Sequence, residues 1–381
     1  MKEGWKAKKL VDICKIQYGY PFDSKQFCDD SKYPQLIRIR DVSRGYSETY
    51  YSGEIPEGYY IDKGDYLIGM DGEFNIAAWN SERALLNQRV CKITANDDAY
   101  DRFLYYNLRI ILKQIEDETP FVTVKHLSAK RLNTVTINLP SLSEQQHIVE
   151  ELDLLSSIIE KKKAQLNELD NLAQSLFYEM FGDPITNENG WEVDMLENVV
   201  ANDCTISYGI VQPGDDVLDG IPVVRPVDLV TIVVEREGLK RVAKDISDSY
   251  KRTILKGGEI LLCVRGTTGI MSFASSNLAG CNVTRGITPL AFGDKLNKYY
   301  AFCYLKSKHI QDIIADNTRG ATLKQINMKD VRQLPMLIPP IDLQNQFASK
   351  IEAIEHQKEL IKQSIKEVET LFNSRMDYYF N

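Results

Sequence analysis

Two short segments of this chain each combine a hydroxyl group with a lysine at the same spacing. They are Thr123-Val-Lys125 and Thr322-Leu-Lys324, which lie 199 residues apart. Lysine and hydroxyl donors are common ligands of nucleic-acid phosphates. Because both side chains recur together, a phosphate clamp explains the repetition better than chance does. We therefore expect Thr123, Lys125, Thr322 and Lys324 to contact phosphate groups.

Other polar segments carry donors that suit base edges or phosphates. The segment Asn87-Gln-Arg89 and the residue Arg285 bear amide and guanidinium groups of the kinds that read adenine and guanine in a major groove. Arg265-Gly-Thr-Thr-Gly269 adds a guanidinium, two hydroxyls and backbone amides, and the loop Asn75–Trp79 also follows a glycine-bounded turn. A surface salt bridge accounts equally well for either Arg89 or Arg285, and a purely structural turn for Arg265–Gly269, so these alternatives stay open. The candidate contacts are Asn75, Gln88, Arg89, Arg265, Thr267, Thr268 and Arg285.

Catalytic and metal-binding signatures are missing from the sequence. It contains no G-x-x-x-x-G-K-S/T phosphate loop, no H-E-x-x-H, no G-x-S-x-G and no N/D-P-P-Y/F motif of amino-methyltransferases. The seven cysteines are scattered without a C-x-x-C pair, and none of the four histidines lies near a cysteine pair. We expect no catalytic residue, no metal site and no cofactor in this chain.

An internal repeat organises the chain. Trp5–Leu10 matches Trp191–Leu196 at an offset of 186 residues. Arg38–Val42 resembles Arg225–Leu229 at an offset of 187, and the offset reaches 199 at the end of the repeated unit. Offsets that only grow indicate insertions in the second copy. The sequence therefore predicts a tandem duplication of a unit of about 190 residues.

The first part of each unit has short runs of Tyr, Val, Ile and Thr that are broken by glycines. Such runs predict short strands, with one helix near 100–117 and another near 297–315. The second part of each unit is a long helix. We expect an α+β fold with a strand-rich domain at 1–142, a long helix at 143–182, a second strand-rich domain at 183–341 and a C-terminal long helix at 342–381.

Both long helices carry an apolar seam at steps of three and four residues. Lys162 interrupts the first seam, and Lys358 lies in the second. Ser143 and Asp342 are the expected caps, and Gly182 is the expected end of the first helix. Exposed apolar stripes need a partner, so the helices should pack as a coiled coil. Length alone allows parallel and antiparallel pairing, but a pseudo-twofold axis relating the two units favours the antiparallel form.

Charge distribution separates the helices from the strand-rich domains. The net charge is −8, and residues 143–182 and 342–381 hold five and two of the excess negative charges. The strand-rich parts are nearly neutral and can carry a basic face. No apolar stretch reaches the roughly 18 residues of a membrane span, and the amino terminus lacks a signal-peptide pattern. We expect a cytoplasmic protein with no membrane partner.

The sequence resembles the DNA specificity subunit of type I restriction-modification systems over its whole length. The segments that carry the resemblance are Trp5 with Leu10, Trp191 with Leu196, Gly64–Gly72, Asn87-Gln-Arg89, Gly258–Gly266 and the junction Leu139-Pro-Ser-Leu-Ser-Glu-Gln-Gln146. The junction is the most specific of these because it recurs at a fixed offset. Its second copy, Ile338–Gln344, has Leu343 where the first copy has a glutamate.

The resemblance implies a non-catalytic subunit that recognises double-stranded DNA. It implies two target-recognition domains that each read one half of a split target, and a coiled coil that sets the gap between the halves. The partners that it implies are two methyltransferase subunits, which would bind S-adenosylmethionine, and restriction motor-nuclease subunits where the system has them.

Two other classes of function compete with this hypothesis. A tandem-repeat coiled-coil scaffold without DNA binding explains the acidic helices but leaves the repeated Thr-x-Lys segments without a purpose. An enzyme, either a nuclease or a self-sufficient methyltransferase, is disfavoured by the missing motifs.

Overall fold

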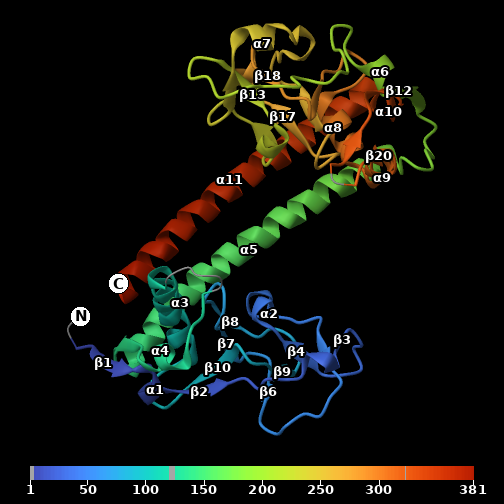
Figure 1. Cartoon of the computed structure of the whole chain (residues 1–381). Helices are drawn as coiled ribbons and strands as arrows, with labels where there is room; N and C mark the ends of the chain where they lie inside the picture. Colours follow the sequence, from blue (N-terminus) through green and yellow to red (C-terminus); the bar gives the residue numbers. More distant parts are fainter. Residues whose placement is uncertain (1–3, 120–124, 322) are drawn as a thin grey trace. The chain divides into compact units, whose positions relative to one another are not determined.

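The computed structural model describes residues 4–119, 125–321 and 323–381. The chain divides into two compact units, the first built from two separate stretches of sequence and the second from one continuous stretch (Figure 1). Unit 1 comprises residues 1–163 and 364–381, and unit 2 comprises residues 164–363. Both long helices, α5 (Leu142–Phe181) and α11 (Ile341–Phe380), therefore contribute one half to each unit.

In its described residues, unit 1 contains three antiparallel or mixed sheets and four short or medium α-helices besides its halves of the long ones. A four-stranded sheet has the order β2-β10-β7-β8, a five-stranded sheet has the order β3-β5-β4-β9-β6, and β1 pairs with β11. Its strands are β1 (Lys6–Lys9), β2 (Cys14–Tyr18), β3 (Phe27–Cys28), β4 (Gln35–Ile37), β5 (Tyr50–Tyr51), β6 (Tyr60–Ile61), β7 (Tyr66–Gly69), β8 (Ile76–Ala78), β9 (Ala84–Leu86), β10 (Val90–Ala95) and β11 (Thr136–Leu139). Its helices are α1 (Leu10–Ile13), α2 (Ile39–Arg44), α3 (Asp101–Glu118) and α4 (Ala129–Asn133).

Unit 2 repeats this plan with small sheets ordered β14-β17-β16-β19, β15-β13-β18, β12-β22 and β20-β21. Its strands are β12 (Glu192–Met195), β13 (Ile221–Val224), β14 (Val233–Val234), β15 (Lys240–Val242), β16 (Ile260–Cys263), β17 (Met271–Ala274), β18 (Asn282–Val283), β19 (Ile287–Leu290), β20 (Thr318–Arg319), β21 (Gln325–Ile326) and β22 (Pro335–Ile338). Its helices are α6 (Leu196–Val199), α7 (Lys244–Asp248), α8 (Lys298–Lys306), α9 (Lys308–Asp316) and α10 (Met328–Arg332).

The medium-length helices differ between the units. In unit 1 the expected helix near 100–117 is α3, which is continuous. In unit 2 the prediction of one helix near 297–315 was wrong, because Ser307 has an extended backbone (φ −57°, ψ 148°) that ends α8 and starts α9. The sequence of unit 2 shows no proline or glycine at this break, so the periodicity of the apolar residues concealed it.

Each long helix has 40 residues and is about 60 Å long at 1.5 Å per residue. The first begins one residue after Ser141, whose Oγ accepts a hydrogen bond from the Glu144 N–H at 3.3 Å. The expected cap at Ser143 was therefore wrong, and Asp342 lies inside the first turn of α11 and not before it. Gly182 follows α5 in the left-handed conformation (φ +77°), which suits the end of a helix.

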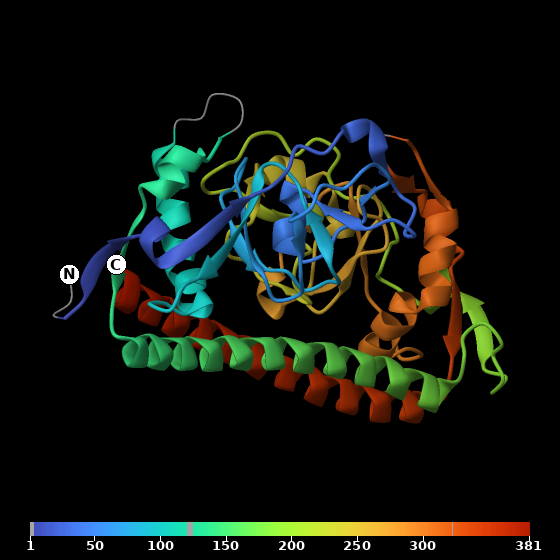
Figure 2. The same ribbon diagram turned by 90° about the horizontal axis from the view of Figure 1, so that it is seen from below.

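The two long helices run antiparallel, as predicted. In unit 1, Glu151 near the start of α5 accepts a hydrogen bond from the Arg375 guanidinium near the end of α11 at 2.8 Å. In unit 2, Asp170 of the second half of α5 accepts a hydrogen bond from Lys358 of the first half of α11 at 2.6 Å. Figure 2 shows the two helices side by side within each unit.

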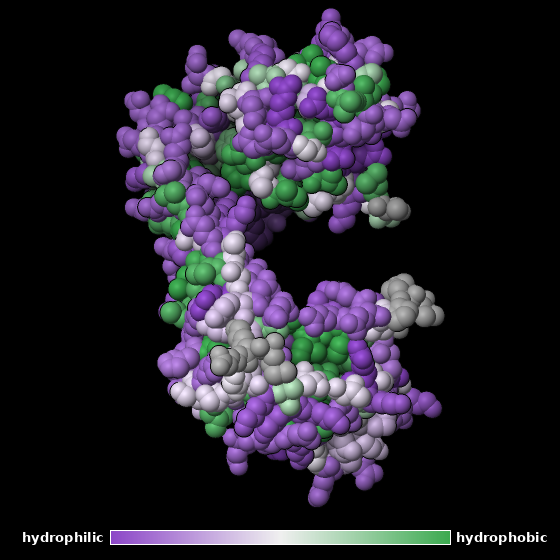
Figure 3. All heavy atoms as spheres, turned by 90° about the vertical axis from the view of Figure 1, so that its left-hand side faces the viewer, coloured by the Kyte–Doolittle hydropathy of each residue, from purple (hydrophilic) through white to green (hydrophobic). Residues whose placement is uncertain are grey.

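The apolar seam of the long helices joins the core of each unit. Seam residues buried in these cores are Ile148, Leu152, Leu155 and Phe372 in unit 1 and Phe347, Ile351 and Ile354 in unit 2, and the neighbouring helix residues Met376 and Phe177 are buried with them. The two seam lysines differ, because Lys162 is half-buried whereas Lys358 is only 5% exposed. The surfaces of both units that are visible in Figure 3 are mostly hydrophilic, with hydrophobic side chains in small groups.

A buried glutamine fixes the start of each long helix. Gln145 is fully buried, and its Nε2 donates to the carbonyl oxygens of Asp98 (3.0 Å) and Pro140 (3.1 Å). Its Oε1 accepts a hydrogen bond from the Tyr100 N–H at 3.1 Å. Gln344 is equally buried and makes the same three bonds in unit 2, at 2.7–3.1 Å. The repeated junction is therefore a structural device that ties the first turn of the long helix to the loop before α3 or α8.

Within the described ranges, no helix has both the length and the apolar character that a membrane span requires. The same part of the chain contains no group of three or more His, Cys, Asp and Glu side chains that could hold a metal ion.

Candidate nucleic-acid interface

One hydrogen-bonded frame organises the polar segments of unit 1. The Met70 N–H donates to the Arg89 carbonyl at 2.9 Å, and the Gly72 N–H donates to the Lys125 carbonyl at 2.9 Å. These bonds bring together the loop after β7, the turn between β9 and β10, and the segment after α3. Asp71 lies at the centre and forms an isolated β-bridge with His126.

The same frame recurs in unit 2. The Val264 N–H donates to the Gly286 carbonyl and the Gly266 N–H donates to the Lys324 carbonyl, both at 2.8 Å. Arg265 lies between them and forms an isolated β-bridge with Gln325. Arg265 therefore takes the place of Asp71, and Gln325 takes the place of His126.

The turn before β10 corresponds to the turn before β19, but the matching residues differ by one position from an alignment of the two arginines. The Gln88 N–H donates to the Tyr20 carbonyl at 2.8 Å, and the Arg285 N–H donates to the Ile210 carbonyl at 2.7 Å in the same way. Gln88, and not Arg89, is thus the structural counterpart of Arg285.

The polar residues of unit 1 line an open hollow of about 690 Å³. Three arginines and two carboxylates line it, so the lining carries a net positive charge. Its lining is Phe22, Ser24, Phe27, Arg38, Ile39, Arg40, Ser43, Asp71, Glu73, Asn75, Asn87, Gln88 and Arg89. The structure therefore brings together three of the expected contacts, Asn75, Gln88 and Arg89.

Arg89 is held in the hollow by an acid and a histidine. Its Nε lies 3.4 Å from a carboxylate oxygen of Asp71, and its Nη1 lies 3.2 Å from Nδ1 of His126. His126 also hydrogen-bonds to Asp71. Arg89 has a left-handed backbone (φ +72°), which is rare for a residue with a side chain and is often found at functional sites. Its guanidinium is half-exposed, so donors remain open to solvent.

Asn75 and Gln88 differ in how much of their side chain is available. Gln88 is exposed at the tip of its turn. The Asn75 Oδ1 is buried and has no hydrogen-bond donor among the described residues. Trp79, at the end of the same loop, is fully buried and donates its Nε1–H to the Glu82 carbonyl at 2.7 Å. The loop therefore presents an amide, while its aromatic ring belongs to the core.

The two lysines of the expected phosphate clamps have different environments. Lys125 is turned toward α3, where its Nζ donates to the Glu116 carbonyl at 2.5 Å and its side chain is 19% exposed. Lys324 is exposed. The accompanying Thr123 and Thr322 lie outside the described residues.

The face of unit 2 is organised around Tyr208. The Arg285 guanidinium lies 5.7 Å from the centre of the Tyr208 ring, and the Gln325 amide donates to the Tyr208 hydroxyl at 3.0 Å. Arg265 is half-buried beside Gln325. Arg285, Gln325 and Arg265 therefore share one small area, and Arg285 is oriented by an aromatic ring where Arg89 is oriented by Asp71.

The two threonines of the Arg265–Gly269 turn have separate roles. Thr267 is exposed, whereas Thr268 is half-buried with its Oγ1 3.0 Å from Oγ1 of Thr318. Thr267 can therefore contact a ligand directly, and Thr268 fixes the turn against β20.

An arginine with the same backbone fixation occurs in both units but was not among the expected contacts. The Arg38 N–H donates to the Asp41 carboxylate at 2.9 Å, and the Arg225 N–H donates to the Asp228 carboxylate at 2.8 Å. The Arg225 guanidinium also binds Asp228, while the Arg38 side chain is exposed in the hollow of unit 1. The match between Arg38–Val42 and Arg225–Leu229 in the sequence already showed that this arginine and the aspartate after it recur in both units.

Other contributors to the site also went unpredicted. Asp71, His126, Arg40, Tyr208 and Gln325 all lie on the two faces. His126 and Gln325 each come directly after an expected lysine in the sequence. Their place on the two faces is shown by the β-bridges that they form with Asp71 and Arg265.

Two copies of one backbone frame, each presenting arginine and amide groups, define a class of protein with a duplicated polar surface. Such a chain presents two separate polar surfaces of the kind that recognise base edges and phosphates. A duplicated protein of this class suits a DNA site in two parts.

Comparisons with known proteins give the family. Residues 2–171 and 214–370 match the family described as the type I restriction modification DNA specificity domain. The specificity subunit of the type I restriction enzyme EcoBI of Escherichia coli is 31% identical over 377 residues, which cover 92% of this chain and 79% of that protein. The MjaIX specificity subunit of Methanocaldococcus jannaschii is 25% identical over 317 residues, or 77% of this chain and 71% of that protein.

Solved structures agree on the fold. The type I restriction-modification S subunit from M. genitalium has a TM-score of 0.55 at 13% identity and covers 98% of this chain and 95% of its own. A chain from a structural study of assembly and conformational transition of a type I system has a TM-score of 0.57 at 19% identity, with coverage of 100% and 98%.

The chain belongs to the type I restriction-modification specificity family. It is a non-catalytic subunit for the recognition of a DNA target, and the catalytic activity lies in other subunits of the complex. The comparisons give no support to a coiled-coil scaffold without DNA binding.

Proposed function

We propose that each unit reads one half of a two-part double-stranded DNA target through the face described above. The observation that carries this proposal is an internal comparison. One backbone frame holds Asp71, His126 and Gln88 in unit 1 but Arg265, Gln325 and Arg285 in unit 2. Identical frames with different hydrogen-bonding groups are what two half-sites of different sequence require.

The groups themselves indicate what each face reads. Arg285 and Arg265 suit guanine, because a guanidinium pairs with O6 and N7. Gln88 suits adenine, and Arg89 suits guanine while Asp71 and His126 hold it in place. Asn75 also lines the hollow of unit 1, so its side chain lies beside the groups that would read the bases.

Groups that recur in both units suit phosphate, which is the same in every sequence. Arg38 is exposed and Lys324 is exposed, so both can reach a DNA backbone. Arg225 and Lys125 would exchange their bonds to Asp228 and Glu116 for phosphate oxygens. Thr123 and Thr322 complete the proposed clamps.

The long helices set the distance between the half-sites and bind the partner subunits in this proposal. Their excess negative charge disfavours contact with DNA and leaves them for protein contacts. Two methyltransferase subunits, one for each repeated unit, would dock there and would carry S-adenosylmethionine. Restriction motor-nuclease subunits would join in systems that cleave DNA.

Fluorescence anisotropy of the complex with its methyltransferase subunits tests the assignment. Gln88→Ala should lower discrimination at one base pair of one half-site by about 1–3 kcal/mol. Arg38→Ala should weaken binding equally for all sequences and reduce the slope of log K against log salt by about one. Arg44→Ala, an exposed arginine that is not part of the hollow lining, is the control and should change neither. Loss of discrimination in both half-sites with Gln88→Ala would contradict the assignment.

A further inference from the structure

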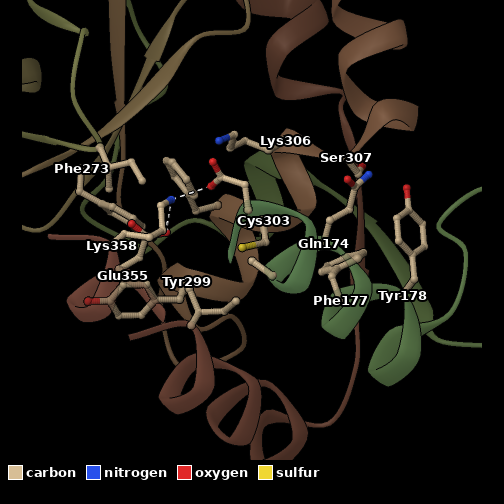
Figure 4. Close-up of a pocket in the computed structure, with 15 residues that line it drawn as sticks. Gln174, Phe177, Tyr178, Phe273, Tyr299, Cys303, Lys306, Ser307, Glu355 and Lys358 are labelled. Carbon is tan, nitrogen blue, oxygen red and sulfur yellow. Dashed lines mark hydrogen bonds and ion pairs between the residues drawn. The ribbon is translucent and has the colours of Figure 1, made fainter. Parts of the chain in front are cut away.

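A cavity of about 290 Å³ lies in unit 2 between α5, α8, α11 and β17 (Figure 4). Its buried lining is mostly apolar and aromatic and includes Phe177, Phe273, Phe302 and Ile351, with two buried polar residues, Ser307 and Lys358. Its exposed lining is polar and includes Asp170, Gln174 and Lys306. The cavity is thus an aromatic floor beneath a polar rim that faces solvent.

The duplication shows why the cavity exists. Phe103 packs on Phe380 in unit 1 with ring centres 5.5 Å apart, and Tyr300 packs on Phe181 in unit 2 at 4.6 Å. These equivalent pairs align α3 with α8 at an offset of 197 residues and the ends of the long helices at an offset of 199. By these offsets, Cys303 replaces Tyr106, and Ala173 replaces Phe372.

In unit 1 the two rings fill the space. Tyr106 and Phe372 have ring centres 6.1 Å apart, and the Tyr106 hydroxyl donates to the Asp153 carboxylate at 2.5 Å. In unit 2 a thiol and a methyl group, those of Cys303 and Ala173, stand at the same places and line the cavity. The cavity is the volume that the two missing aromatic rings would occupy.

The polar groups at the cavity call for a neutral ligand. Lys358 is buried, but Asp170 and Glu355 bind its ammonium at 2.6 Å and 2.9 Å (Figure 4), so its charge is already balanced. Burial raises the pKa of Cys303 to about 12, which keeps its thiol uncharged. Ser307 is 8% exposed, and its Oγ has no hydrogen-bond partner among the described residues. One unpaired hydroxyl group therefore remains to be satisfied.

We propose that this cavity is a binding site for a small, neutral aromatic molecule of one or two rings with a hydrogen-bonding substituent. The ring would rest on Phe177, Phe273 and Phe302, in the space that Tyr106 and Phe372 fill in unit 1, and the substituent would pair with the Ser307 hydroxyl. Engineered apolar cavities of about 150 Å³ accept benzene, so a cavity of about 290 Å³ has room for a substituted ring. This site is separate from the DNA-reading face of unit 2.

Phenol is the probe for the first experiment, and alkylation of Cys303 is the readout. The full chain is treated with a thiol reagent with and without phenol, and each cysteine is followed by mass spectrometry. Phenol should slow the modification of Cys303 at least threefold, with saturation, and leave Cys28 of unit 1, which is also half-buried, unchanged. Equal rates at Cys303 with and without phenol would overturn the proposal.

Variants copied from the other unit test the location of the site. Ala173→Phe and, separately, Cys303→Tyr restore a ring of unit 1 and should each reduce phenol affinity at least tenfold in isothermal titration. Leu172→Phe adds the same ring at an exposed position of α5 and should bind phenol normally. Cys303→Ser keeps the cavity open and should retain binding. Unchanged phenol affinity in every ring-restoring variant that folds would overturn the proposal, and one folded variant is enough for this test.

Discussion

Replacement of the fully buried Gln145 by alanine should destabilise unit 1 strongly. The change removes three neutral hydrogen bonds and leaves the carbonyl of the buried residue Pro140 without the side-chain donor of Gln145. A neutral hydrogen bond contributes roughly 1 kcal/mol, and a buried group without a partner costs about 1–3 kcal/mol. We therefore expect a loss of about 3–4 kcal/mol in the free energy of unfolding of unit 1.

Its neighbour provides a matched control. Gln146 is exposed, and its side chain donates a hydrogen bond to Glu150 on the next turn, at 2.9 Å. Gln146→Ala should change the free energy of unfolding by less than about 0.5 kcal/mol. Gln344→Ala is the equivalent change in unit 2 and should produce a loss of the same size there.

Differential scanning calorimetry with hydrogen exchange measures both the size and the place of the loss. For a unit of this size, 3 kcal/mol corresponds to a fall of about 6–12 °C in melting temperature. Faster exchange should appear in unit 1 for Gln145→Ala and in unit 2 for Gln344→Ala. Equal effects of Gln145→Ala and Gln146→Ala would refute the structural role of the repeated junction.

Three further outcomes are expected. Lys358→Met should change the free energy of unfolding by less than about 1 kcal/mol, because the carboxylates of Asp170 and Glu355 can return to water. The double change Asp170→Ala with Glu355→Ala should cost about 3 kcal/mol, because it leaves the buried Lys358 ammonium unpaired. Urea denaturation that ranks the two variants in the opposite order would contradict this expectation. The hydrogen bond from Arg375 holds the pKa of Glu151 below its usual range, so the pair stabilises unit 1 fully above the unfolded pKa of about 4.3, and this stabilisation is lost as pH falls through the lower folded pKa. Glu151→Gln should remove this part of the pH dependence of the free energy of unfolding. An unchanged pH dependence in unit 1 would show that the pair does not contribute. Four residues inserted after Leu166 and four after Ile365 should keep the helices folded and lengthen the gap between the two half-sites by about one to two base pairs. Four helical residues add about 6 Å, and one base pair spans about 3.4 Å. A gap of unchanged length in methylome mapping would assign the spacing to the partner subunits.

Features with long-range periodicity were predictable from the sequence. The heptad seam, the repeat offsets and the Gln145–Gln344 correspondence are each repeated signals along the chain, and antiparallel pairing followed from the duplication. The break at Ser307 was not predictable, because an apolar helical pattern continues across it and the extended backbone depends on packing in unit 2.

The candidate site was predictable only in part. Gln88, Arg89 and Asn75 meet in one hollow because three loops converge there, and residue type alone had pointed to each loop. The positions of Asp71 and His126 depend on a β-bridge between residues 55 positions apart, which no local pattern specifies. The equivalence of Gln88 with Arg285 likewise depends on backbone hydrogen bonds and not on residue identity.

Single-molecule methylome sequencing of a host that carries a grafted chain tests the central claim most directly. Residues 183–341 would be replaced by the corresponding segment of a relative, with both long helices and unit 1 left intact. One half of the methylated target should change to that of the relative, while the other half and the length of the gap stay the same. A change in both halves, or in neither, would contradict the assignment of one half-site to each unit.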